Sequence, residues 1–210
     1  MTEANKSGRE ATTAAILDAA EELFSSRGFS AVSVRAIAER AGISHALVHR
    51  YIGRKIDIWN AVLERNARGM LQAAPDNPDI LATTSLMLRS GLAQYRHYVR
   101  LVAYAALHGP SSGFPTGVYG ATERLVELAE RVAASAAPAE QTDESLDPRF
   151  VIACVDAFFF GWITMESWLL KRTGLEDMDE TEIVDGVERV ILGILRDNLP
   201  GLESDGPTSR

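Results

Sequence analysis

The sequence predicts an all-α protein in two parts, an N-terminal domain of three helices followed by a larger helical domain. Three observations lead to this fold class. Apolar residues recur at helical spacing along most of the chain, no useful length alternates as a strand would, and glycines close short segments near the N-terminus. The length of 210 residues and the apolar share of 46% are sufficient for a buried core.

The first predicted helix covers residues 12–28. Its apolar residues follow the stripe of an amphipathic helix, namely Ile16, Ala19, Ala20, Leu23 and Phe24, and Gly28 can terminate it. A second helix of about two turns follows Ser33, which can cap it, and ends at Gly42. Ser44 can cap a third short helix that turns Val48 and Ile52 inward. The tight turn between the last two helices predicts a helix-turn-helix, whose final helix is presented outward.

The rest of the chain predicts longer helices, separated by segments rich in proline and glycine. We expect them at residues 55–73, 79–107 (as one helix or two), 116–136, 149–172 and 180–199. The predicted domains are residues 10–54 and residues 55–200, with flexible ends at 1–9 and 201–210.

The charge is distributed unevenly between these two parts. The formal net charge of −8 argues against a nucleic-acid partner, because phosphate binding requires cations. Residues 1–65, however, hold nine Lys and Arg against eight Asp and Glu, whereas residues 66–210 hold twelve against twenty-one. Two modules with different partners are therefore indicated. A DNA interface would depend on where the cations lie rather than on their number.

The first residues, MTEANKSGRE, lack the pattern of a secretory leader, so we expect a cytoplasmic protein with no membrane partner. The most apolar segment, FVIACVDAFFFGWITMESWLL, contains Asp156 and Glu166 with nine residues between them, far fewer than the ~20 that span a bilayer. It predicts a core or interface helix. The lone Cys154 in this segment excludes an intrachain disulfide, and we expect it to be a small buried residue.

The third short helix leaves a polar face outside the predicted core. With Val48 and Ile52 turned inward, the opposite face carries His45, Ala46 and His49. Planar polar side chains can read base edges in the major groove, and an alanine can contact a thymine methyl group. The face is therefore suited to DNA.

The run SVRAIAERAGISHALVHRYIGRKIDIWNAV resembles the DNA-binding signature of TetR-type transcriptional repressors, and ILDAAEELFSSRGF resembles that family's first helix. The resemblance covers about the first 62 residues and implies a homodimer with two DNA-reading heads and an effector-binding domain. It implies that the bases are contacted by Arg35, His45, Ala46 and His49, and that phosphates are contacted by Ser33, Leu47, Tyr51 and Lys55. We add Arg50 and Arg54 to the phosphate set because they lie beside this face.

The chain departs from the family pattern at four places. His49 replaces a common tyrosine, Leu47 a small or hydroxyl residue, and Ile52 a phenylalanine, while Gly53-Arg54 replaces a Pro/Ser turn. These changes affect the expected operator sequence and the phosphate role of Leu47.

His45 and His49 also have the i, i+4 spacing of a zinc-binding pair. The metalloprotease form of that motif requires Glu after the first His, and here Ala46 follows. The remaining histidines, His97 and His108, belong to the second domain. We predict no metal and no cofactor. It stays open whether both histidines merely cover a solvated surface, and whether Arg35 simply pairs with Glu39.

The second domain concentrates aromatic residues and interior glycines. An effector pocket is predicted from Tyr95, Tyr98, Tyr104, Phe114, Trp162, Met165 and Trp168, with plain core packing as the alternative for each. Gly161, Gly186 and Gly193 weaken their helices unless they permit close helix packing. We therefore expect residues 149–172 and 180–199 to pair with their copies in a homodimer, with packing inside one chain as the alternative.

These observations predict a ligand-responsive, homodimeric DNA-binding transcriptional regulator and not an enzyme. It would be a repressor that a small, mostly apolar effector releases from a near-palindromic operator. The rival interpretations are an all-helical enzyme and a protein-interaction module that uses the aromatic cavity. Against the enzyme, no helix carries a Ser/His/acid, Cys/His or Glu-x-x-His grouping.

Overall fold

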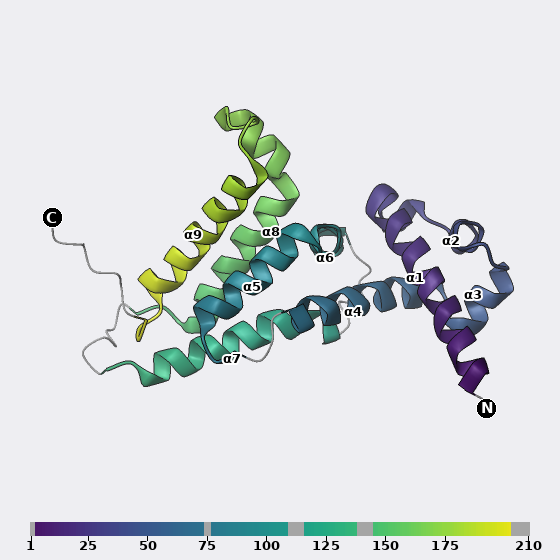
Figure 1. The fold of residues 1–210 in the computed structure, drawn as a ribbon, viewed down its shortest axis with the longest axis horizontal. Coiled ribbons are helices and arrows are strands. Elements are labelled where there is room, and N and C mark those ends of the chain that lie inside the picture. Colours follow the sequence, from purple (N-terminus) through teal and green to yellow (C-terminus); the bar gives the residue numbers. More distant parts are fainter. Residues whose placement is uncertain (1–2, 74–76, 109–115, 138–144, 203–210) are drawn as a thin grey trace. The chain divides into compact units, whose positions relative to one another are not determined.

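The computed structural model describes residues 3–73, 77–108, 116–137 and 145–202, and within these ranges the chain forms helices and no strand (Figure 1). The predicted all-α fold class is confirmed. The elements are α1 (Glu3–Ala31), α2 (Val34–Ala41), α3 (His45–Tyr51), α4 (Lys55–Ala73), α5 (Ile80–Ala93), α6 (Arg96–His108), the 3-10 turn η1 (Thr116–Tyr119), α7 (Gly120–Ser135), α8 (Pro148–Thr173) and α9 (Glu180–Asn198).

The chain divides into two compact units. The first consists of residues 1–68 and 100–118, and the second of residues 69–99 and 119–210. Two helices, α4 and α6, therefore contribute residues to both units.

α1 is longer than its apolar stripe predicts. It begins at Glu3, so most of the segment that we expected to be flexible is helical. At Gly28 the backbone leaves the helical region, with φ 75° and ψ 162°, and the chain kinks before the last residues of the helix. The positive φ explains why glycine occupies the kink, since a side chain there is strained.

The core of the first unit forms where α1 to α4 meet. Three aromatic rings pack together, with centroid distances of 4.9 Å between Phe24 and Trp59 and 5.1 Å between Phe29 and Trp59. Ile37 of α2 and Val48 of α3 are fully buried beside this core. A buried apolar residue thus stabilises each of these helices, which are too short to be stable alone.

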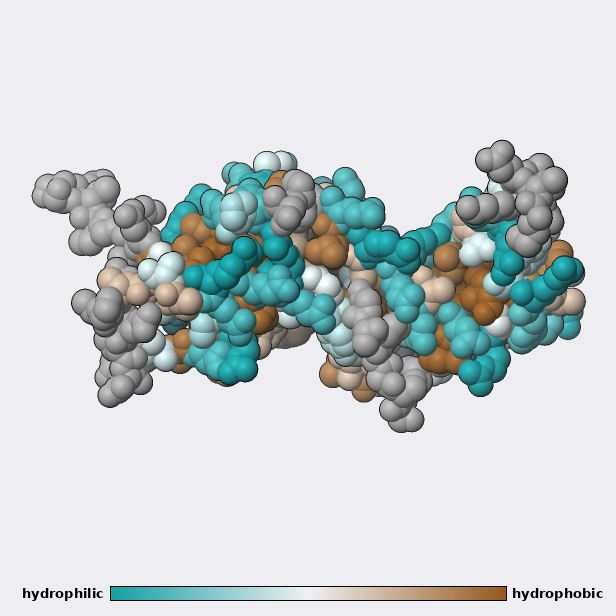
Figure 2. Space-filling view, turned by 90° about the horizontal axis from the view of Figure 1, so that it is seen from below, coloured by the Kyte–Doolittle hydropathy of each residue, from teal (hydrophilic) through white to brown (hydrophobic). Residues whose placement is uncertain are grey.

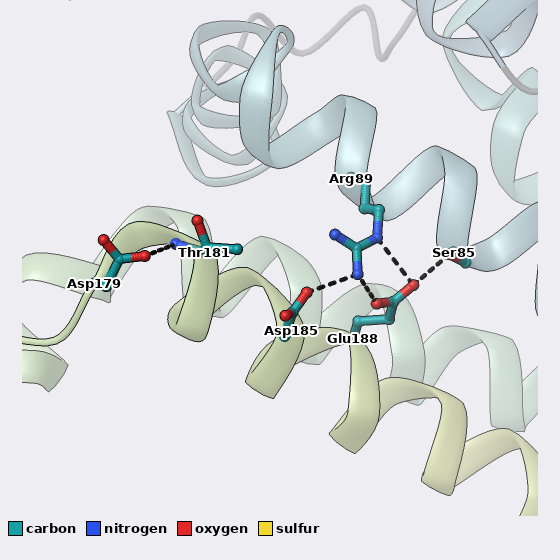
Figure 3. Close-up of polar contacts among 6 residues, drawn as sticks. All are labelled: Ser85, Arg89, Asp179, Thr181, Asp185 and Glu188. Atoms are coloured by element: carbon teal, nitrogen blue, oxygen red, sulfur yellow. Dashed lines mark hydrogen bonds and ion pairs between the residues drawn. The ribbon is translucent and has the colours of Figure 1, made fainter.

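The second unit is built from α5, α7, α8 and α9. Arg89 of α5 reaches α9, where its Nη2 lies 2.7 Å from Oδ1 of Asp185 and also bonds to Glu188, which accepts from Ser85 as well (Figure 3). Arg96, at the start of α6, pairs with the buried Glu166 of α8. Charged side chains thus link α5 to α9 and α6 to α8.

The expected 79–107 segment is two helices, because the chain turns after Ala93. The backbone N–H groups of Gln94 and Tyr95 both donate to the Ser90 carbonyl, which ends α5. One turn earlier, a Cβ built at Gly91 would come within 2.4 Å of the Phe159 ring of α8. Glycine is therefore needed at this close approach of α5 and α8.

α8 leaves an apolar face uncovered. Four large apolar residues on α8 and α9 are 45–57% exposed, namely Phe150, Met165, Trp168 and Val190. Cys154 is exposed on α8, so our expectation that it is buried was wrong; it lies outside the stripe that packs inward. By length and composition alone α8 could cross a membrane, but 33% of its most apolar window is buried inside this unit. Figure 2 shows brown, hydrophobic residues at the surface of the chain among hydrophilic ones.

Asp156 lies at the contact of α7 and α8, where its Oδ2 accepts a hydrogen bond of 2.7 Å from the Thr122 hydroxyl. Burial raises the pKa of Asp156, and the bond from Thr122 only partly opposes this shift. The folded protein therefore keeps the Asp156 carboxyl protonated at a pH at which the same carboxyl in the unfolded chain is ionised. The contribution of Asp156 to the free energy of unfolding should therefore fall as the pH rises from the ordinary carboxyl pKa near 4 toward the raised pKa of Asp156.

Replacing this carboxyl with a group that does not titrate tests the shift. We expect Asp156→Asn to gain stability relative to wild type as the pH is raised from about 4 to 7, because the variant loses the cost of ionising a buried acid. Denaturant unfolding at a series of pH values measures the difference. Parallel stability curves for the two proteins would contradict the expectation.

Candidate nucleic-acid interface

The turn between α2 and α3 sets the direction of α3. The Ser33 hydroxyl accepts the Ala36 N–H at 3.1 Å and begins α2, while Gly42, with φ 68°, ends it. The N–H of Ile43 then bonds to the Ala38 carbonyl at 3.0 Å, and the Ser44 hydroxyl accepts the Leu47 N–H at 3.3 Å to begin α3. Local hydrogen bonds therefore satisfy the ends of both short helices.

α3 buries one residue, Val48, and leaves its opposite face open to solvent. His45, Ala46 and His49 are all exposed, as the spacing predicted. The two imidazole rings lie at 72° to each other with centroids 4.7 Å apart. This face, which we call the reading face, offers two planar donor and acceptor groups with an alanine between them.

Two histidines alone make an incomplete metal site. In the part of the chain that the structure describes, no group of three or more His, Cys, Asp or Glu is placed to hold a metal ion.

Arg35 projects from the first turn of α2 and is engaged with Glu39. Its Nε lies 3.0 Å from Oε1 of Glu39, and the two side chains are 82% and 67% exposed. An ion pair so exposed contributes little to stability and is easily exchanged. Arg35 can thus leave Glu39 for a nucleic-acid acceptor.

The predicted phosphate residues differ in their placement. Arg50 is exposed and has no carboxylate partner among the described side chains, whereas Arg54 pairs with Asp57 at 3.4 Å. Leu47 and Tyr51 are half-buried at the edges of α3. The Ser33 hydroxyl oxygen accepts a bond in the α2 cap, but its hydrogen remains available as a donor.

Lys55 is turned toward its own domain. Its Nζ donates to the Ser30 carbonyl at 3.3 Å and lies 4.3 Å from the centroid of the Phe29 ring. Burial lowers the pKa of Lys55. A phosphate contact by Lys55 would require this side chain to turn away from Ser30 and Phe29. The sequence showed that Lys55 begins a helix but not that its side chain is engaged in this way.

Asp57 is a carboxylate close to this interface that the sequence reasoning did not include. Its Oδ2 accepts the Arg54 N–H at 2.7 Å and so begins α4. The backbone bond from Arg54 is the main reason that the pKa of Asp57 is lowered. Its position three residues after Arg54 was the signal available in the sequence, because acids favour the first turn of a helix.

The seven predicted effector residues differ in where the structure places them. Within the second unit Tyr98 is buried, and Tyr95 and Trp162 are half-buried, but Met165 and Trp168 are exposed on α8 and enclose nothing in this chain. Tyr104 belongs to the first unit, where its ring lies against Gly28, and Phe114 lies outside the described residues. The indole Nε1 of Trp162 is buried and has no hydrogen-bond partner among the described residues.

Comparison with known proteins agrees with this geometry. The family model for bacterial regulatory proteins of the tetR family matches residues 16–62. The HTH-type transcriptional repressor Rv3405c of Mycobacterium tuberculosis is 30% identical over 188 residues, which cover 90% of this chain and 91% of that protein.

Solved structures of low sequence identity share the fold. The putative transcriptional regulator SCO4942 of Streptomyces coelicolor superimposes with a TM-score of 0.64 at 20% identity, covering 89% of this chain and 97% of that one. The fatty acid degradation regulator FadR of Bacillus halodurans gives a TM-score of 0.63 at 18% identity, covering 87% and 95%.

The conformation of Gly42 provides a test of how the turn sets the reading face. A Cβ at this position would meet nothing within 4 Å, so its cost is the left-handed backbone alone. We expect Gly42→Ala to lower the free energy of unfolding by about 1–2 kcal/mol, and Gly42→Asn to lower it by less, because asparagine tolerates this conformation better. Denaturant titration followed by circular dichroism measures both. If both variants lose the same free energy of unfolding, the positive φ of Gly42 is not the cause of the loss.

Proposed function

Because this chain belongs to the tetR family of bacterial regulatory proteins and is a DNA-binding transcriptional regulator, we propose that it is a homodimeric repressor whose reading face binds a near-palindromic operator. The observation that carries the proposal is the exposure of His45 and His49 on a helix that buries only Val48. A recognition helix contacts base edges with residues near its N-terminus.

The bases are proposed to be contacted from two helices. His45, Ala46 and His49 would enter the major groove, and Arg35 of α2 would exchange Glu39 for an acceptor on a base, most favourably the paired acceptors of guanine. Ser33, Leu47, Arg50, Tyr51, Arg54 and Lys55 would contact phosphates along the edges, Lys55 after release from Ser30. A phosphate would compete with the Asp57 carboxylate for the Arg54 side chain.

The repressor role is supported by the relative Rv3405c, which is named a repressor and matches most of this chain. As in other helix-turn-helix dimers, the two reading faces would be separated by one turn of DNA, about 34–36 Å, or a multiple of it. The operator would then repeat the two-fold symmetry of the protein.

A second copy of this chain is the proposed occupant of the uncovered face of α8 and α9. Phe150, Met165, Trp168 and Val190 are exposed there, and added Cβ atoms at Gly161, Gly186 and Gly193 would meet nothing within 4 Å. Among the residues that the structure describes, these glycines therefore do not serve close packing within the chain. A two-fold pairing of residues 149–172 and 180–199 would bury this apolar face and give glycine a function in close helix approach.

The effector is proposed to be a small, mostly apolar molecule held within the second unit. Tyr95, Tyr98 and Trp162 remain candidates to line its site, and the unpartnered Nε1 of Trp162 is a donor that a polar end of the ligand could satisfy. The similar fold of FadR, a regulator of fatty acid degradation, is compatible with a ligand of this kind.

Effector binding would reach the reading face through the helices that belong to both units. α4 begins directly after the helix-turn-helix, and Tyr104 of α6 lies against the Gly28 kink of α1 within the first unit. A ligand that binds one arrangement of these helices more tightly shifts the population toward it. Release of DNA would follow if that arrangement moves the two reading faces out of register.

If the reading face contacts bases, substitution of its residues should lower the affinity for the operator. We expect His49→Ala and Arg35→Ala each to weaken binding of the dimer to the selected operator by about 30-fold or more, because each substitution removes one specific contact of ~1–3 kcal/mol from each subunit. Glu39→Gln should bind at least as tightly as wild type, because it frees Arg35. Operator selection from random duplexes, followed by fluorescence anisotropy, provides the measurement, with the exposed Arg68→Ala as a control. An enzyme or a protein-interaction module would select no symmetric sequence, and that result would overturn the proposal.

Dimer formation predicts sensitivity to charge on the uncovered face. We expect Val190→Asp and Trp168→Asp to convert the dimer to a monomer, because an aspartate would be buried there without a partner. Leu107→Asp introduces the same charge at a residue that is 75% exposed on α6 and should leave the dimer intact. Analytical ultracentrifugation distinguishes these states. A wild-type monomer at high concentration would refute the pairing.

A further inference from the structure

The first two turns of α1 bring one more cation to the edge of the reading face. The guanidinium carbon of Arg9 lies 5.8 Å from the centroid of the Tyr51 ring, at the end of α3. This contact is explained by the stripe of α1. Arg9 precedes the fully buried Ile16 by seven residues, so it continues the packed face of the helix beyond the end of the core. Figure 1 shows the first turns of α1 beside α3.

Most arginines near this edge are already paired. Arg35, Arg40 and Arg54 each contact a carboxylate, at 3.0 Å, 2.5 Å and 3.4 Å respectively. Arg9 is exposed and has no carboxylate partner among the described side chains, a property that it shares here with Arg50. Arg9 and Arg50 can therefore offer their charge to a phosphate without first breaking an ion pair, and without the release from a backbone carbonyl that Lys55 requires.

The contact with Tyr51 favours this use. An aromatic ring attracts a guanidinium through the ring face and leaves the N–H groups, which lie in the guanidinium plane, available as donors. An ion pair would occupy the same donors. Tyr51 thus limits the positions of a long side chain while keeping its hydrogen-bonding capacity.

We infer that Arg9 contacts a DNA phosphate beside the end of α3 and that Tyr51 positions it there, so that the N-terminal turns of α1 extend the interface beyond the helix-turn-helix. This inference rests on the proposed function, since it requires that the reading face binds duplex DNA. Because a phosphate carries no sequence information, Arg9 adds affinity and orientation rather than specificity.

The test compares Arg9→Ala, Arg9→Lys and the control Arg68→Ala on the selected operator and on a scrambled duplex. Arg68 is also exposed and without a carboxylate partner among the described side chains, but it lies thirteen residues along α4 from Lys55, or roughly 20 Å along the helix axis. We expect Arg9→Ala to weaken binding to both duplexes roughly tenfold at low salt. The slope of log Kd against log salt concentration should decrease by about two per dimer, one for each lost phosphate contact. Arg9→Lys should keep most of the slope.

A double-mutant cycle tests the part played by Tyr51. If the ring positions Arg9, the loss caused by Arg9→Ala should be smaller in a Tyr51→Leu background than in the wild type. Equal losses in both backgrounds would refute the positioning role.

The outcomes separate the two proposals. Wild-type protein that binds no duplex selectively would overturn the proposed function and this inference with it. Wild-type protein that binds its operator, with Arg9→Ala matching Arg68→Ala in affinity and salt slope, would overturn the inference alone. Thermal melting of each variant identifies any loss that arises from unfolding.

Discussion

The interface depends on holding a helix that is too short to be stable alone. α3 has seven residues, and isolated helices of fewer than about 12 residues are marginal in water. The burial of Val48, the cap at Ser44 and the left-handed turn at Gly42 replace the missing length. These three features occupy one side of α3 and its N-terminal end. The opposite side, the reading face, is therefore not needed for stability, and its side chains can serve binding.

In the first unit the placement of the charged side chains, more than their number, determines what can reach DNA. Its residues hold eleven Lys and Arg against eight Asp and Glu, so its net charge attracts DNA only weakly. Instead its exposed ion pairs, such as Arg35 with Glu39, hold cations in place at little energetic cost and can be exchanged for phosphate or base acceptors. Arg50 and Arg9 require no exchange. The position of each carboxylate is therefore as important as that of each cation.

Much of the fold could be predicted because its signals are local. Ser44 and Gly42 mark the ends of helices through bonds to neighbouring residues, so the sequence alone revealed α2 and α3. The placements of Lys55 and Arg9 were not predicted because they depend on residues 25 and 42 positions away, Ser30 and Tyr51. The exposure of Trp168 was not predicted for a different reason: composition identifies an aromatic residue but not the side of the helix that the core covers.

Two helices, α4 and α6, run from one unit into the other. Each helix contributes residues to both units, and in the first unit α6 reaches α1 at Gly28, where the backbone is already outside the helical region. The aromatic residue next to this kink, Phe29, packs on Trp59 of α4 and lies under the ammonium group of Lys55. A displacement of α6 against the kink would therefore act on the start of α4, directly behind the reading face. A close-packed core of this kind transmits strain between the residues that it joins.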